Sequence, residues 1–216
     1  MLKFNSIDNL FIGQSYSGVN SNDTRLKDTG TKTTLKCYVS KHKGFEKYLE
    51  KSEVTKDRDF NKWKVITAQA SFGGFGNMFI GNPNEICNQS YILFEVVNEE
   101  EAKSLLSYMK CRLPNLLLSL RKASQHTCKS TCKWIPLPPL NKEWTDEEVY
   151  KLYSLSEDDI KLINDTNIVG YRNIVKQPNV IVENEVIELE VKPKVKKLRI
   201  VKPKKSLVIV EDYETV

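Results

Sequence analysis

A histidine and two cysteines form the first group of residues that could do chemistry. Cys128 and Cys132 lie close to His126 in the sequence. Thiolate and imidazole groups bind zinc, but a C-x3-C spacing supplies half of a structural zinc site, and no second cysteine pair follows. Ser124 or Cys128 beside His126 also lacks the third, orienting group that a catalytic triad needs. We therefore predict no metal site and no nucleophilic catalysis in this segment.

A second group, near the end of the chain, imitates a nuclease motif. Glu188, Glu190 and Lys192 follow the E-x-K pattern of metal-dependent nucleases. Such carboxylates must lie on a buried central strand, beside an upstream aspartate, to hold a catalytic metal ion. Here they lie in a Lys/Pro-rich stretch, and Pro178 is followed by Asn179 rather than by aspartate. We predict no catalytic residues from this pattern.

The composition allows a folded domain with a modest positive charge. The 216 residues are 40% hydrophobic and 9% aromatic, which is enough for a core, and the net charge is +5 with a pI near 8.8. No run of about eighteen apolar residues is present, and the first residues lack a signal-peptide pattern. We expect five reduced cysteines and a cytoplasmic or nucleoid-associated location, or a host nucleus, viral factory or virion if the source is viral.

Strand patterns alternate with helix patterns along the first three quarters of the chain. We expect strands at 35–39, 63–70 and 89–97, with a glycine-rich loop at 71–85 and a further strand-like stretch at 133–137. Helices are expected after the capping residues Asn98, Thr145 and Ser156, because an acidic residue follows three positions later in each case. Pro114 should interrupt the first of these helices, and a second helix should run on to Arg121.

These elements predict an α+β domain with a mixed sheet and flanking helices, followed by a tail. The domain is expected to cover residues 1–167. Residues 168–216 are rich in Lys, Val and Pro, with eight basic and no acidic residues between Lys192 and Lys205. Such a composition is typical of a poorly ordered, largely extended segment.

Four segments carry a resemblance to a known family. They read KVITAQASFGG, ICNQSYILFEVVNEEEAKSLLSYMK, LLLSLRKASQH and WIPLPPLNKEWTDEEVYKLYSLSEDDIKLI. Their order and spacing resemble the C-terminal half of Eco57I-like, adenine-specific restriction–modification DNA methyltransferases, with SLRK-x-x-QH and W-T-D-E-x-x-Y as the most specific signatures. That half is the target-recognition domain of those enzymes. The resemblance implies a stand-alone module that binds double-stranded DNA, and the Lys/Asn/Ile-heavy composition suggests a large DNA virus or phage.

The catalytic half of such a methyltransferase has no counterpart in this sequence. The stretch 72–76, FGGFG, looks like a cofactor loop, but no βα unit of the right size precedes it. The stretch 82–85, NPNE, lacks the second proline and the aromatic residue of an Asn/Asp-Pro-Pro-aromatic active site. We therefore expect no cofactor and no enzymatic activity, so that the chain would act in recognition alone.

If the resemblance holds, basic residues near the helix ends should contact DNA phosphates. Neighbouring polar side chains should reach base edges or phosphates. The glycine-rich loop should let the protein backbone approach the duplex closely. The alternative for each basic residue is a solvated position that faces a helix dipole. Trp134 and Trp144 are expected to be packing residues. Family members usually carry basic and aromatic residues through the segment 111–115, where this chain keeps only Arg112, which indicates general rather than sequence-specific affinity. The predicted DNA-binding residues are Lys110, Arg112, Arg121, Lys122, Gln125, His126, Lys129, Lys133, Gly74 and Asn77.

Two other classes of function remain open at the level of sequence. The chain could be a fragment or subunit of an adenine-specific methyltransferase or a restriction endonuclease whose catalytic part is encoded separately. It could also be a repurposed viral structural or genome-associated protein. A steep dependence of DNA affinity on salt separates the binding module from the structural protein. Incubation of DNA with Mg²⁺ or a methyl donor tests for an enzyme.

Overall fold

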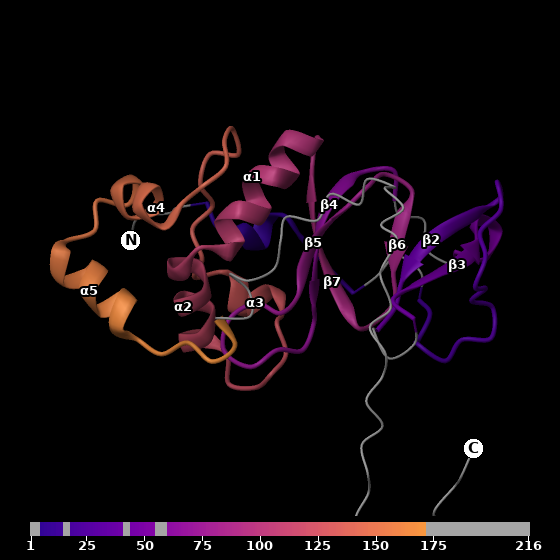
Figure 1. The fold of residues 1–216 in the computed structure, drawn as a ribbon, viewed down its shortest axis with the longest axis horizontal. Helices are drawn as coiled ribbons and strands as arrows, with labels where there is room; N and C mark the ends of the chain where they lie inside the picture. The colour runs from indigo at the N-terminus through magenta and orange to yellow at the C-terminus, as the bar shows by residue number, and fades with distance from the viewer. Residues whose placement is uncertain (1–4, 15–17, 41–43, 55–59, 172–216) are drawn as a thin grey trace, which may run out of the picture. The chain divides into compact units, whose positions relative to one another are not determined.

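The computed structural model describes residues 5–14, 18–40, 44–54 and 60–171. Within these residues, strands precede helices along the chain, which confirms the predicted α+β class (Figure 1). The strands are β1 (Phe11–Gln14), β2 (Thr34–Tyr38), β3 (Glu46–Glu50), β4 (Trp63–Ala68), β5 (Met78–Gly81), β6 (Glu85–Cys87) and β7 (Tyr91–Val96). The helices are α1 (Glu99–Lys110), α2 (Arg112–Arg121), α3 (Lys129–Cys132), α4 (Asp146–Leu152) and α5 (Glu157–Asp165).

The strands form two sheets. The larger has the order β1-β7-β4-β5, and each neighbouring pair in it is antiparallel. The smaller has the order β3-β2-β6, in which β2 is antiparallel to β3 and parallel to β6. The mixed sheet that we predicted is therefore the smaller one.

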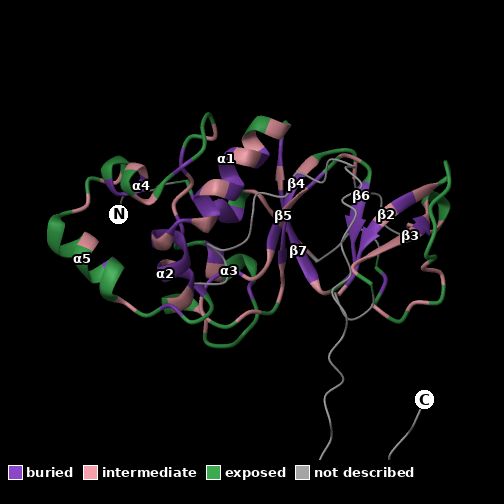
Figure 2. Ribbon diagram, in the orientation of Figure 1, coloured by how far each residue is buried: buried purple, intermediate pink, exposed green. Residues whose placement is uncertain are grey.

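The central strands of the larger sheet are covered on both faces. Successive side chains of a strand point to opposite sides, so the side chains of β4 and β7 enter two different hydrophobic clusters. Val65 and Phe94 pack with α1 and α2 in one hydrophobic cluster. Ile66 and Leu93 pack with β2, β3 and β6 in the second cluster. Figure 1 shows α1 and the smaller sheet on opposite sides of β4 and β7, and Figure 2 shows these two strands buried over most of their length.

Three helices, α1, α4 and α5, begin at the residues that the sequence predicted. Asn98 accepts a hydrogen bond from the Glu101 backbone N–H (2.8 Å), and Thr145 and Ser156 form capping boxes with Glu148 and Asp159. The expected interruption at Pro114 was wrong: the break falls at Cys111, and Pro114 lies in the first turn of α2, where its missing N–H is tolerated. No described helix is long and apolar enough to span a membrane.

Two further local expectations were wrong. The segment 133–137 is not a strand, although Ile135 is fully buried. The expected loop 71–85 contains the short strand β5 and the first residue of β6. At the other end of the domain, Ile168 and Tyr171 still pack in the core, so packed structure extends to at least Tyr171. The boundary near 167 stays a prediction, and the expected tail lies outside the described residues from 172 onward.

Candidate nucleic-acid interface

The segment that follows α2 is held against the end of β4 by backbone pairing. Thr127 N donates to Gln69 O (2.8 Å), and Ser71 N donates to Gln125 O (2.9 Å). Ala70 and His126 form an antiparallel bridge between these two bonds. Main-chain pairing therefore sets the position of Gln125 and His126 and leaves their side chains exposed.

The glycine-rich loop at 71–76 is pinned to α2 from two directions. The Lys122 ammonium group donates to Ser71 O (2.7 Å), Ser71 Oγ (2.9 Å) and Gly74 O (3.4 Å). The fully buried Asn115 accepts a hydrogen bond from Phe75 N (2.9 Å), and it donates to the carbonyl groups of Met109 and Cys111 (both 2.7 Å). Gly74 is buried against Asn115, where a Cβ atom would collide with the amide. Its backbone therefore faces the protein and does not lie open to a duplex.

Arg112 is also occupied by the protein itself. Its guanidinium group donates to the carbonyl oxygens of Ile163 (2.6 Å), Asn164 (2.7 Å) and Thr166 (2.5 Å), which lie at the end of α5. The same group lies 5.2 Å from the centre of the Tyr171 ring. Arg112 thus caps the carboxyl end of α5, and its contacts give it a structural role.

The remaining predicted residues divide by exposure. Lys110 is half-buried, and burial lowers the pKa of its ammonium group. Asn77 is half-buried as well, with its carbonyl oxygen bound by Ala68 N (3.0 Å). Three cations are exposed together with two polar side chains: Arg121, Lys129, Lys133, Gln125 and His126. We call these five residues the basic face.

The exposed cations of the basic face have no acidic partner within the described ranges, which is also true of the exposed Lys32, Lys51, Lys151 and Lys161. Within the described ranges, no carboxylate lies within ion-pair distance of Arg121, Lys129 or Lys133. By contrast, seven other basic side chains pair with a nearby carboxylate: Arg25, Lys27, Lys36, Lys47, Lys62, Lys103 and Lys142. The positive charge of the basic face is therefore not neutralised within the described domain.

A sequence signal for this difference exists, although local motif reading overlooked it. No Asp or Glu occurs from Ala102 to Lys142, a stretch that covers most of α1, all of α2 and α3, and the basic face. The next stretch is the reverse, because Asp and Glu dominate from Glu143 to Asp165. Opposite charges are thus separated along the sequence, and the basic face lies within the first stretch.

Trp134 contradicts the expectation that both nearby tryptophans are packing residues. Trp144 is buried at 8% exposure, as expected, and its indole N–H donates to Pro139 O (3.2 Å). Trp134 is 52% exposed, and the Arg121 guanidinium carbon lies 4.8 Å from its ring centre. The contact joins the last residue of α2 to the residue that follows Lys133, so an aromatic group belongs to the surface of the basic face.

The cysteine cluster does not come together as a metal site. Cys128 is exposed, and its hydrogen bond with Ser130 lowers the pKa of its thiol. Cys132 is buried, and burial raises the pKa of its thiol to about 12, so this thiol stays protonated at neutral pH. Among the described residues, no three His, Cys, Asp or Glu side chains gather in a metal-binding arrangement.

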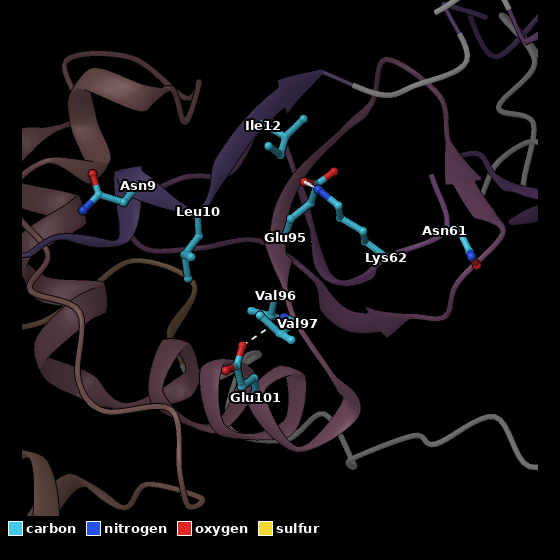
Figure 3. A pocket seen from close by; sticks show the side chains of 9 residues that line it. All are labelled: Asn9, Leu10, Ile12, Asn61, Lys62, Glu95, Val96, Val97 and Glu101. Atoms are coloured by element: carbon cyan, nitrogen blue, oxygen red, sulfur yellow. Dashed lines mark hydrogen bonds and ion pairs between the residues drawn. The ribbon is translucent and has the colours of Figure 1, made fainter. Parts of the chain in front are cut away.

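An open pocket of about 400 Å³ lies elsewhere, beside β1, β7 and the start of α1 (Figure 3). It contains two carboxylates and one lysine, and each takes part in an interaction. Lys62 and Glu95 form an ion pair (3.4 Å), and Glu101 accepts a hydrogen bond from Val97 N (2.9 Å). None of the ten predicted site residues lines this pocket.

The chain matches no protein-family model, and no curated protein is similar enough in sequence to count as a match. The resemblance to target-recognition domains therefore rests on the four segments quoted above. The geometry of the basic face is independent of that resemblance.

Proposed function

We propose that this chain binds double-stranded DNA as a target-recognition module of the restriction–modification type and performs no chemistry of its own. The observation that carries the proposal is the exposed charge of Arg121, Lys129 and Lys133, which no carboxylate of the described residues pairs. Cations that lack an acidic neighbour can neutralise phosphates and release counterions without first breaking an ion pair. The resemblance of the surrounding segments to target-recognition domains points to the same ligand.

The basic face offers two kinds of contact in one place. Lys129 and Lys133 supply charge for backbone phosphates, which positions a duplex without reading its sequence. Gln125 and His126 supply exposed amide and imidazole groups, which can reach base edges or phosphates. Both lie on a segment fixed by main-chain pairing to the end of β4, so little order has to be gained on binding.

The test compares two double variants that change the net charge equally. Lys129→Gln/Lys133→Gln removes two cations from the basic face, and Lys151→Gln/Lys161→Gln removes two exposed cations from α4 and α5. Affinity for a fluorescent 25-base-pair duplex would be measured by anisotropy over a range of salt concentrations. We expect the slope of log K against log salt to become shallower by about 1.8 in the first variant, or about 0.9 for each phosphate that is no longer neutralised.

The matched variant decides the location of the binding surface. Lys151→Gln/Lys161→Gln should leave the slope nearly unchanged, because those residues lie in the acidic stretch. An equal loss of affinity in both variants would show that only net charge matters, and absence of binding at low salt would reject the proposal. Cleavage of plasmid DNA with Mg²⁺, or methyl transfer from a methyl donor, would contradict the second half of the proposal.

A further inference from the structure

Trp134 and Arg121 are in direct contact at the surface of the basic face. The guanidinium group of Arg121 lies over the indole ring at 4.8 Å from the ring centre, and about half of the Trp134 surface is exposed. Lys133 precedes Trp134 in the chain, and Lys129 lies one helical turn earlier on α3. An aromatic group is thus presented to solvent together with cations that have no acidic partner in the part of the chain that the structure describes.

The backbone around Trp134 is fixed although the side chain is exposed. The neighbouring residues Cys132 and Ile135 are both fully buried. Ile135 N donates to Cys132 O (3.1 Å), and Ile135 O accepts a hydrogen bond from Ile7 N (3.0 Å). Arg121 is the last residue of α2, whose core side is also buried. Both partners of the contact therefore stand on anchored backbone.

We propose that the Trp134–Arg121 pair stacks on an unpaired nucleobase, so that the preferred ligand is DNA with a locally unstacked base; this rests on the DNA binding proposed above. In an intact duplex both faces of each base are covered by its neighbours, and an indole ring can reach a base face only where stacking is interrupted. The Arg121 guanidinium adds a cation–π contact, and the adjacent lysines hold the phosphates on either side.

Tryptophan and arginine also serve as anchor residues in protein–protein interfaces. Nucleic acid is favoured here because Arg121 contacts the ring, Lys133 is its neighbour in the chain, and no acidic residue occurs from Ala102 to Lys142. A protein interface is usually depleted of lysine at its centre. A protein partner remains as an outcome of the test.

The experiment uses the full chain and three DNA probes of equal length: a perfectly paired duplex, the same duplex with one central mismatch, and a single strand. The two duplexes carry the same number of phosphates, so their difference reports the unpaired bases alone. We expect the mismatched duplex to bind about tenfold more tightly than the paired one, within the range of a single base–aromatic stack. Binding should also quench the indole fluorescence.

Three variants separate stacking from charge and from apolar surface. Trp134→Leu should lose the tenfold preference and most of the quenching while it keeps affinity for the paired duplex within about twofold. Arg121→Lys keeps the charge, so the salt dependence should persist while the preference falls. Leu120→Ala removes another exposed apolar side chain from the end of α2 and should change neither quantity. Circular dichroism confirms folding, and Trp134→Phe, which retains a ring, should keep most of the preference.

The outcomes for this inference and for the proposed function differ. Equal affinity for paired and mismatched duplexes, unaffected by Trp134→Leu, would overturn the stacking inference and leave DNA binding intact. Failure to bind any of the three probes would overturn both and would point to a protein partner for Trp134. A mismatch preference that survives Trp134→Leu would also overturn the inference, because the unpaired base would then be recognised elsewhere.

Discussion

Arg121 and Lys122 are neighbours in the sequence, yet their side chains have different environments. Arg121 is exposed and contacts Trp134, whereas Lys122 is half-buried and bound to three oxygen atoms of the glycine-rich loop. A variant that removes both cations would therefore combine weaker DNA binding with a disturbed loop. The lysines of α3 and its C-terminal cap avoid this ambiguity, which is why the binding test uses them.

The pKa of Lys122 predicts a pH dependence of stability. Burial lowers this pKa to about 8, against 10.5 for an unperturbed lysine, although the three oxygen acceptors stabilise the charged form. Between these two values the unfolded chain binds more protons than the folded chain, so the contribution of Lys122 to the unfolding free energy increases as the pH rises from 8 to 10.5. Urea unfolding of wild type and Lys122→Met measures this effect. The unfolding free energy of wild type, relative to that of Lys122→Met, should increase over that pH range. A pH-independent difference would contradict this assignment.

Arg112 should contribute to stability and not to DNA affinity. Arg112→Gln removes the donors to the carbonyl groups of Ile163, Asn164 and Thr166, so we expect the unfolding free energy to fall by about 2 kcal/mol. Denaturant unfolding measures this change, and Lys129→Gln serves as a surface control with little effect. If Arg112→Gln were as stable as wild type but bound DNA more weakly, Arg112 would be a DNA-contacting residue and its structural role would be contradicted.

At the scale of elements, the loop between β4 and β5 depends on one close contact. Gly74→Ala would press a methyl group against the Asn115 amide, which also binds Phe75 N, Met109 O and Cys111 O. We expect the unfolding free energy to fall by about 2–4 kcal/mol. In Gly74→Ala/Asn115→Ala the methyl group gains room, so the double variant should be destabilised by less than the sum of the single variants. Strict additivity in a double-mutant cycle would show that the two residues are not coupled.

Sequence reasoning succeeded for elements whose signals are local. The caps at Asn98, Thr145 and Ser156 depend on residues three positions apart, and β7 is marked by a run rich in aromatic and β-branched residues. The edge strands β1 and β3 were missed, because they are short and are stabilised by pairing with β7 and β2. The strand β5 was hidden by the glycines and Pro83 on either side of it.

The candidate site shows the same division between local and distant causes. The density of cations at the end of α2 is visible in the sequence, but the distant partners of Lys122 and Arg112 are not. Ser71 lies 51 positions before Lys122, and Ile163 lies 51 positions after Arg112. The exposure of Trp134 was mispredicted because it also depends on the tertiary structure. Cys132 and Ile135 occupy the core positions of this segment, so Trp134, which lies between them in the sequence, is left at the surface.

At the scale of the whole molecule, positive charge occurs in two separate stretches of the chain. One is the acid-free stretch Ala102–Lys142, part of which forms the basic face. The other is the stretch Lys192–Lys205, with eight basic and no acidic residues, which lies outside the described residues. Between them lies the acidic stretch Glu143–Asp165. If both basic stretches contact DNA, they should contribute in different ways, because only the first combines its charge with an aromatic platform and exposed polar side chains.

Replacement of the eight tail cations by glutamine tests this division. Cations that contact only phosphates bind any DNA backbone, whether or not its bases are paired. The variant should therefore bind the paired and the mismatched duplex more weakly by the same factor. The salt slope should become shallower by about 0.9 for each phosphate that the tail had neutralised. Anisotropy with both duplexes over a range of salt concentrations measures the two quantities. The ratio of the two affinities should remain at the wild-type value, because that ratio belongs to Trp134 and Arg121. A changed ratio would mean that the tail takes part in base recognition, and an unchanged salt slope would mean that the tail does not touch the DNA.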